Sequence, residues 1–241
     1  MNADLDRRRI RRPLSMDEFH RLVAAAEIGR RIQGVSGPDR AVLYIVGAYT
    51  GFRRNEIGSI TPQSFNLDSD PPTLTVAAGH SKHRRTDVLP LRTDFANRIR
   101  TWMAQKTNSR SKSPLIDVRD KRTAEMIRKD LKAARKAWID EAATDRERKE
   151  REESSLLTYV DANGHYADFH ALRKTFITNL SRANVHPKMA QTLARHSDIN
   201  LTMNVYTMLG VLDQAAAVEA LPPVPTTEAQ ASGPQLRATG T

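Results

Sequence analysis

The spacing of apolar residues predicts a chain that is mainly helical. Stretches in which apolar residues recur at positions i, i+3, i+4 and i+7 are typical of amphipathic helices. Such stretches run through residues 19–26, 42–49, 95–103, 127–138, 172–180, 190–194 and 201–209. Residues 73–78 and 86–91 instead indicate two short strands joined by a hairpin tip at 79–85. The predicted fold class is therefore α+β, mainly α with small β-hairpins.

Local signals place several helix ends. Ser15 followed by Glu18 is the pattern of a capping box at the start of the first helix. Residues 34–40 predict a loop, and Gly51 is expected to end the second helix in the manner usual for a C-terminal glycine. Thr93 is expected to cap the helix that follows the two strands.

Three short helices are expected near the carboxyl end. The first would end at Asn184, and Pro187 suits the first turn of the second. Ser197 or Asp198 is expected to cap the third. The buried stripe of this third helix is predicted to be Leu201, Val205 and Leu209.

Two segments before these helices complete the pattern. Residues 145–153 carry charges of alternating sign, which is typical of an exposed helix or of disorder, and we assign them no function. The Asn-Gly step within residues 161–164 predicts a hairpin turn. That hairpin would lead directly into His170.

Charge and composition narrow the class of partner. The chain of 241 residues has a formal net charge of +10, which favours an anionic partner, nucleic acid first and an anionic membrane second. Aromatic residues make up only 5%, so contact with duplex backbone is favoured over stacking on single strands. No apolar run approaches the roughly 18 residues of a membrane helix. The absence of cysteine permits a cytoplasmic location, with nucleoid association when DNA is bound.

Four residues near the carboxyl end carry the candidate chemistry. His170 and Arg173 are three residues apart and share one face of the predicted helix. His196 and Tyr206 follow them. The set offers phosphate hydrogen-bond donors, an imidazole that can move a proton, and a hydroxyl nucleophile. This combination suits attack of a tyrosine on a phosphodiester. A histidine-based metal site is disfavoured because cysteine and a nearby carboxylate pattern are both missing.

The order and spacing of these four residues resemble the C-terminal signature of the tyrosine recombinases, or phage integrase family. An upstream match strengthens the resemblance, because TGFRRNEI is similar to the family's first motif. By that match Arg53 is a catalytic arginine and Glu56 the carboxylate that holds it, with Arg54 as the rival for the arginine. His170, Arg173, His196 and Tyr206 take the remaining catalytic roles that the resemblance implies.

The predicted hairpin tip adds a candidate general acid. Lys82 matches the mobile lysine of the family, and a lysine gives up a proton readily when other cations surround it. The alternative is a basic hairpin that only touches DNA backbone. DNA-binding roles are predicted for His83, Arg84, Arg85 and Lys174.

The resemblance also implies the organisation and the partners. It predicts a basic arm at residues 1–14, a catalytic domain at 15–215 similar to the type IB topoisomerase core, and a partly disordered tail at 216–241. The implied activity is site-specific cleavage and rejoining of double-stranded DNA through a 3′-phosphotyrosyl intermediate, without metal or other cofactor. Integration or excision of a mobile element would use a homo-tetramer on synapsed DNA, with a monomer off DNA.

Alternatives and departures remain beside this expectation. A type IB topoisomerase-like relaxation of supercoils uses the same chemistry, and a non-catalytic DNA-binding relative would keep only the surface. Arg195 replaces the glycine usual in the family before the second histidine, so the local turn is expected to differ. The helical clamp domain that usually precedes the catalytic domain has no counterpart in residues 1–14.

Overall fold

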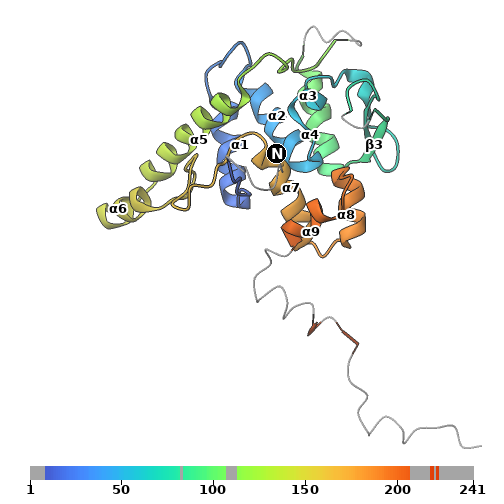
Figure 1. The fold of residues 1–241 in the computed structure, drawn as a ribbon. Helices are drawn as coiled ribbons and strands as arrows, with labels where there is room; N and C mark the ends of the chain where they lie inside the picture. Colours follow the sequence, from blue (N-terminus) through green and yellow to red (C-terminus); the bar gives the residue numbers. More distant parts are fainter. Residues whose placement is uncertain (1–8, 82–83, 107–112, 207–217, 220, 223–241) are drawn as a thin grey trace, which may run out of the picture. The chain divides into compact units, whose positions relative to one another are not determined.

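The computed structural model describes residues 9–81, 84–106, 113–206, 218–219 and 221–222 (Figure 1). Lys82 and His83, the residues from 207 to 217 and most of the predicted tail lie outside this description. The described elements are α1 (Met16–Ile28), α2 (Gly37–Thr50), α3 (Arg54–Ile57), η1 (Pro62–Ser64), β1 (Phe65–Asn66), β2 (Thr73–Val76), β3 (Asp87–Pro90), α4 (Thr93–Ala104), α5 (Thr123–Asp140), α6 (Asp145–Glu153), α7 (Ala171–Arg182), α8 (Pro187–Ala194) and α9 (Asn200–Tyr206). The prediction of a mainly helical α+β fold is confirmed.

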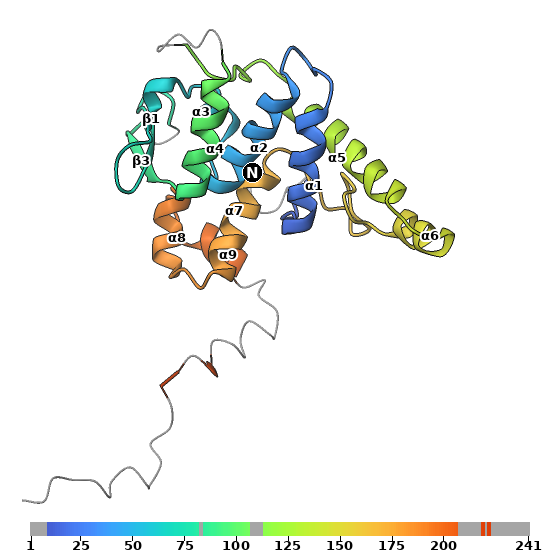
Figure 2. The same cartoon turned by 180° about the vertical axis from the view of Figure 1, so that it is seen from behind.

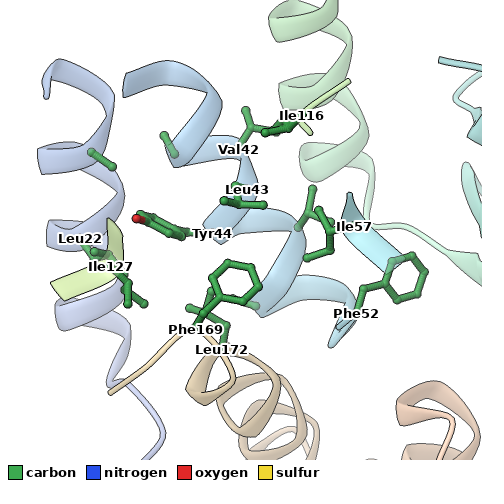
Figure 3. Packing of buried hydrophobic residues seen from close by; sticks show 14 of the residues in the cluster. Leu22, Val42, Leu43, Tyr44, Phe52, Ile57, Ile116, Ile127, Phe169 and Leu172 are labelled. Atoms are coloured by element: carbon green, nitrogen blue, oxygen red, sulfur yellow. The ribbon is translucent and has the colours of Figure 1, made fainter. Parts of the chain in front are cut away.

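Helix α2 lies at the centre of the core. It packs against α1 and α7, and α1 packs in turn against α5. Apolar side chains of these helices meet around Leu43 and Tyr44 of α2, which are fully buried (Figure 3). Arg40 of α2 is buried as well, and its guanidinium binds the Asp130 carboxylate of α5 with Nε–Oδ2 at 2.8 Å. The ion pair of Arg40 with Asp130 fixes the amino-terminal part of α2, and the carboxyl end of the helix is where the candidate site begins.

Most of the predicted helix ends are confirmed. The capping box of Ser15 and Glu18 is present, and Gly51 ends α2 with φ 61°. The predicted loop at 34–40 is wrong in its second half, because the Ser36 side chain caps α2 and the helix already begins at Gly37. The prediction for Thr93 is also wrong: it is the first residue of α4, behind Arg92 at the cap position.

The small sheet has three antiparallel strands in the order β1-β2-β3. Leu74 of β2 pairs with Leu89 of β3, and both side chains are buried against the core. The two predicted strands are confirmed in shortened form. Strand β1 was not predicted because two residues carry too little pattern to be seen in a sequence.

The segment from 145 to 166 matches its predictions in part. Residues 145–153 form the exposed helix α6, which continues outward from the end of α5 (Figures 1 and 2). Gly164 makes the expected turn with φ 75°, but the hairpin is reduced to a single bridge between Val160 and Tyr166. Within the described residues, no helix is long and apolar enough to cross a bilayer.

The carboxyl-terminal helices pack as a small group beside the main core. Asn184 has φ 53° and separates α7 from α8, as predicted. The Asp198 carboxylate accepts the Asn200 amide at 2.9 Å at the start of α9. The predicted stripe of α9 is wrong at Leu201, which is 48% exposed, because the helix buries Thr202 instead. The predicted stripe residue Leu209 lies outside the described residues.

Residues 9–14 lie along α7 and the 160–166 turn. Arg11 pairs with Asp168 at 3.0 Å, and Arg12 pairs with Glu18 at 2.8 Å. The Leu14 amide donates to the buried Thr175 hydroxyl at 2.9 Å. This part of the predicted basic arm is therefore bound to the protein itself, and two of its guanidinium groups already have carboxylate partners.

Candidate active site

Arg173 joins the carboxyl ends of two helices. It projects from the first turn of α7 and is 4% exposed. Its guanidinium donates to the Gly51 carbonyl beyond α2 at 2.5 Å and to the Ala194 carbonyl at the end of α8. Helix carboxyl ends carry partial negative charge, so the two ends together stabilise a buried cation. Burial first, then Arg53 and Arg195, lower the pKa of Arg173 to about 9, which leaves it charged at neutral pH.

Arg53 and Glu56 form a second fixed cation beside Arg173. The Arg53 amide donates to Glu56 Oε2 at 2.8 Å, and its guanidinium Nη1 donates to Oε1 at 3.1 Å. Glu56 is buried, whereas the Arg53 side chain is 28% exposed. The rival Arg54 donates to the Lys121 carbonyl instead, at 3.2 Å. The carboxylate thus orients Arg53 and leaves part of its guanidinium open to solvent.

An open cleft of about 490 Å³ lies over Arg53. It is lined by residues 53–56 of the α2–α3 region, by His80 and Ser81 of the β2–β3 connection, and by His170. The structure therefore brings the first motif, the approach to the predicted hairpin tip and the start of α7 to one cleft. These segments are far apart in the sequence.

His170 lies at the cap position of α7, just before the helix that carries Arg173. Although its side chain is open to the cleft, the protein packed around the ring, together with Arg11 and Arg173, lowers its pKa to about 4. The imidazole is therefore neutral at pH 7. Arg11 contributes to this shift from the docked arm.

His196 follows α8 and is held by α9. Its Nδ1 lies 2.9 Å from the hydroxyl of Thr202, which is fully buried. Burial first, then Arg173 and Arg53, lower the pKa of His196 to about 4. The guanidinium groups of Arg173, Arg53 and Arg195 all contribute to this shift, so the neutral ring of His196 lies in one cluster with them. The sequence alone gave no sign of the Thr202 partner, because a helical threonine is ordinary.

Arg195 is the residue of this group that the sequence did not single out as functional. Residue 195 has φ 53° and ψ 46°, the left-handed region in which glycine is unstrained, and a difference of this turn from that of the family stays a prediction. An arginine pays about 1–3 kcal/mol for that conformation. Its side chain is 4% exposed and donates to Glu56 Oε2 at 3.1 Å.

Tyr206 lies at the end of α9. Its ring packs against the cluster of Phe176, Ile177 and Ala194, and its hydroxyl donates to the Val185 carbonyl at 2.6 Å. Partial burial raises the pKa of the phenol above its usual value. In this state the hydroxyl is bound to the α7–α8 connection. The hydroxyl thus binds a different backbone carbonyl from those bound by Arg173, which are the carbonyls of Gly51 and Ala194. The Arg53 guanidinium binds Glu56.

The other predicted site residues have mixed outcomes. Lys82 and His83 fall outside the described residues, so their roles stay predictions. Arg84 and Arg85 are exposed, and Arg85 Nε donates to Asp87 at 3.0 Å. Lys174 is half-buried and donates to the Arg11 carbonyl at 2.7 Å, so one of its contacts holds the amino-terminal arm.

The fold is that of tyrosine recombinase catalytic domains. The chain is similar to the structure of XerA recombinase, with 17% identity, a TM-score of 0.57, and coverage of 89% of this chain and 67% of that one. It is similar to the Tn1549 transposon integrase solved with circular intermediate DNA, with 15% identity, a TM-score of 0.56, and coverage of 86% and 66%. The bacteriophage HP1 integrase catalytic domain matches with 17% identity, a TM-score of 0.53, and coverage of 87% and 95%.

The family profile of phage integrases matches residues 12–210. The chain belongs to the phage integrase family. It spans about two thirds of the XerA chain and of the Tn1549 integrase chain in those structures, and nearly all of the HP1 domain. A search of curated protein sequences gave no significant match.

Proposed function

We propose that this protein is a site-specific DNA recombinase that cuts and rejoins strands through a tyrosine ester. The observation that carries the proposal is that two fixed guanidinium groups, Arg53 and Arg173, and the neutral ring of His196 lie in one cluster beside an open cleft. A phosphodiester is an anion whose non-bridging oxygens gain charge during attack. Fixed donors directed at such oxygens accelerate the reaction, and loss of one donor typically costs about 10²–10³ in rate.

In the proposed reaction Tyr206 is the nucleophile. Its phenolate oxygen forms a bond to phosphorus while the bond from phosphorus to the 5′ oxygen breaks. The products are a 3′-phosphotyrosyl strand and a 5′ hydroxyl. Attack by the 5′ hydroxyl of a second strand reverses the step and releases Tyr206. Because the ester conserves the bond energy, the exchange requires neither ATP nor a metal ion.

Proton transfer would involve His170 and Lys82. The neutral imidazole of His170 accepts or positions the phenolic proton. A pKa of about 4 describes the ring without DNA, and a phosphate anion in the cleft would raise it toward the working pH. Lys82 would protonate the departing 5′ oxygen from the hairpin tip. For catalysis the Tyr206 hydroxyl has to leave the Val185 carbonyl.

The proposed partner is double-stranded DNA. Related structures hold the Tn1549 integrase with circular intermediate DNA and XerH recombinase with its difH substrate. The net charge of +10 and the exposed Arg84 and Arg85 support contact with duplex backbone. By the same family likeness we propose a tetramer on synapsed DNA and a role in moving a mobile element.

A covalent trap tests the proposal. The probe is a labelled pool of duplexes with randomised sequence around a nick placed a few nucleotides downstream of each candidate phosphate. Cleavage then releases a short 5′-hydroxyl fragment, and the protein stays attached to the labelled strand. We expect a denaturation-resistant adduct that forms equally well with EDTA present. Absence of an adduct across the pool, or its loss in EDTA, would contradict the proposed chemistry.

A second substrate separates recombination from relaxation. The duplex recovered from the pool is placed twice in one supercoiled circle. We expect recombinant circles, because the proposed function joins strands of two sites. Relaxation of the circle without any recombinant product would contradict the recombinase function and favour topoisomerase-like activity.

A further inference from the structure

Arg195 contacts three parts of the candidate site. Its Nη2 donates to Glu56 Oε2 at 3.1 Å, and its Nε lies 3.9 Å from Asp87 Oδ2 on β3. Its guanidinium carbon lies 4.0 Å above the centre of the Phe52 ring, the geometry of a cation–π contact. One side chain at the end of α8 therefore reaches both the α2–α3 region and the sheet.

The Glu56 carboxylate is shared between two guanidinium groups. Its Oε2 accepts from the Arg53 amide and from Arg195, while its Oε1 accepts from the Arg53 guanidinium. Since Glu56 is only 2% exposed, its orientation is set by these contacts. Because both Arg53 and Arg195 bind the Glu56 carboxylate, the carboxylate fixes the orientation of the Arg53 guanidinium more firmly than a single ion pair would.

The link to β3 continues toward the predicted general acid. Asp87 accepts from Ser81 Oγ at 3.1 Å and from Arg85 Nε at 3.0 Å. Ser81 directly precedes Lys82 in the sequence. Arg195 thus lies between the carboxylate that orients Arg53 and the carboxylate at the base of the hairpin.

Stability alone does not account for Arg195. Its backbone adopts the left-handed conformation, and its Nη1 is buried without a hydrogen-bond partner among the described residues. Both features oppose folding, and a buried ion pair is weak evidence for stability in any case. The buried charge of Arg195 is better explained by its effect on the orientation of Glu56 and Asp87.

We propose that Arg195 is a positioning residue that acts through Glu56 and Asp87 to align Arg53 with the start of β3, where Asp87 binds Ser81. The proposal rests on the proposed function, because the alignment matters for a phosphodiester in the cleft. Its positive charge also acts on the neighbouring groups, since Arg195 contributes to the lowered pKa of both Arg173 and His196. This second effect is measurable without DNA.

The test compares Arg195→Met with Arg195→Lys. Both variants keep a long stem and the same backbone strain, but only lysine keeps the charge. In single-turnover assays with the nicked pool, we expect Arg195→Met to form adduct at least tenfold more slowly at unchanged DNA affinity. Arg195→Lys should recover part of the rate. Arg40→Met, which removes another buried guanidinium outside the site, should lower stability without this selective loss.

Two readouts separate positioning from damage to the fold. Proton NMR of the DNA-free protein should show a higher pKa for His196 in Arg195→Met and little change in Arg195→Lys. A combined Glu56→Gln and Arg195→Met variant should lose less rate than the sum of the two single losses, because both changes remove the same Arg195–Glu56 interaction. If Arg195→Met does not fold, Arg195→Gly relieves the strain and is tested in its place.

The outcomes distinguish this inference from the proposed function. A wild-type protein that forms no adduct contradicts the function, while the NMR comparison still tests Arg195. A wild-type protein that forms adduct, with Arg195→Met at the same rate and His196 at an unchanged pKa, contradicts this inference alone. Fully additive losses in the double variant would also overturn it.

Discussion

The two ends of the candidate site are built in different ways. The guanidinium end lies where the main core meets the start of α7 and the end of α8: Arg173 binds the carbonyls of Gly51 and Ala194, and Glu56 is buried between Arg53 and Arg195. The tyrosine end belongs to the small group of α7–α9, where Tyr206 is only partly buried and its hydroxyl is held by one backbone carbonyl.

In the proposed reaction, this difference separates the groups that must stay fixed from the side chain that must move. Electrostatic stabilisation is strongest when the donors are oriented before the reaction, as burial in the core provides. A nucleophile that travels to the phosphate needs contacts that break without unfolding the core. A single hydrogen bond contributes only about 0.5–1.5 kcal/mol to stability, so the Tyr206 hydroxyl can be released at low cost.

The largest effect is expected at the tyrosine end. Tyr206→Phe removes the proposed nucleophile and one hydrogen bond, so we expect complete loss of the covalent adduct with DNA affinity near that of the wild type. Denaturing gels and filter binding measure the two quantities. Tyr166→Phe is the matched control and should keep activity. An adduct formed by Tyr206→Phe would show that another residue attacks.

The guanidinium end should lose both rate and stability. Arg173→Lys cannot span the Gly51 and Ala194 carbonyls, so we expect about 10²–10³ slower cleavage and about 1–3 kcal/mol lower stability. Arg53→Lys should lose rate with a smaller change in stability, because its side chain is 28% exposed. Adduct kinetics and urea denaturation measure these effects. Equal destabilisation by both variants would contradict the expectation that Arg173 contributes more to stability than Arg53.

A pH dependence of stability should follow from His170 and His196. Each has a folded pKa of about 4, below the usual 6.5, so the unfolded chain binds protons that the folded chain refuses. Their contribution is complete above pH 6.5 and is lost as the pH falls toward 4. Urea denaturation between pH 7 and 4.5 should therefore show a shallower decline for His196→Gln than for the wild type. Parallel curves would contradict the low pKa of His196.

The smallest effect is expected for Thr202, whose hydroxyl contacts the His196 ring. Thr202→Val keeps the shape of the side chain but removes the hydroxyl that faces Nδ1. If loss of the hydrogen bond that orients the ring raises the activation free energy by about 1 kcal/mol, cleavage becomes roughly fivefold slower. Single-turnover adduct kinetics measure the change, and Thr101→Val on the exposed face of α4 is the control. A loss as large as that of Arg173→Lys would make Thr202 more than a support for the ring.

Sequence reasoning reached the fold class and most of the helix ends. The capping box at Ser15, the stop at Gly51 and the break at Asn184 depend on local chemistry, which a sequence displays directly. It failed at Leu201, because the burial of α9 is decided by its neighbours and by the Thr202–His196 contact. Strand β1 was too short to leave a pattern.

The sequence predicted the residues of the candidate site, but it did not predict how their side chains are arranged in space. The motifs pointed to Arg53, Arg173 and His196, and the structure places them close enough to act on one another electrostatically. The use of helix carboxyl ends to hold Arg173 depends on tertiary packing and could not be deduced from spacing. Arg195 was noted only as a departure, because its partners Glu56 and Asp87 lie more than a hundred residues away in sequence.

Mapping the attachment point of DNA tests the central claim most directly. The trapped adduct is digested with protease and nuclease, and mass spectrometry locates the nucleotide on a peptide. The account predicts a 3′-linked nucleotide on Tyr206 in the wild-type protein. A nucleotide on any other side chain, or linkage through the 5′ phosphate, would contradict delivery of Tyr206 to the cluster of Arg53, Arg173 and His196.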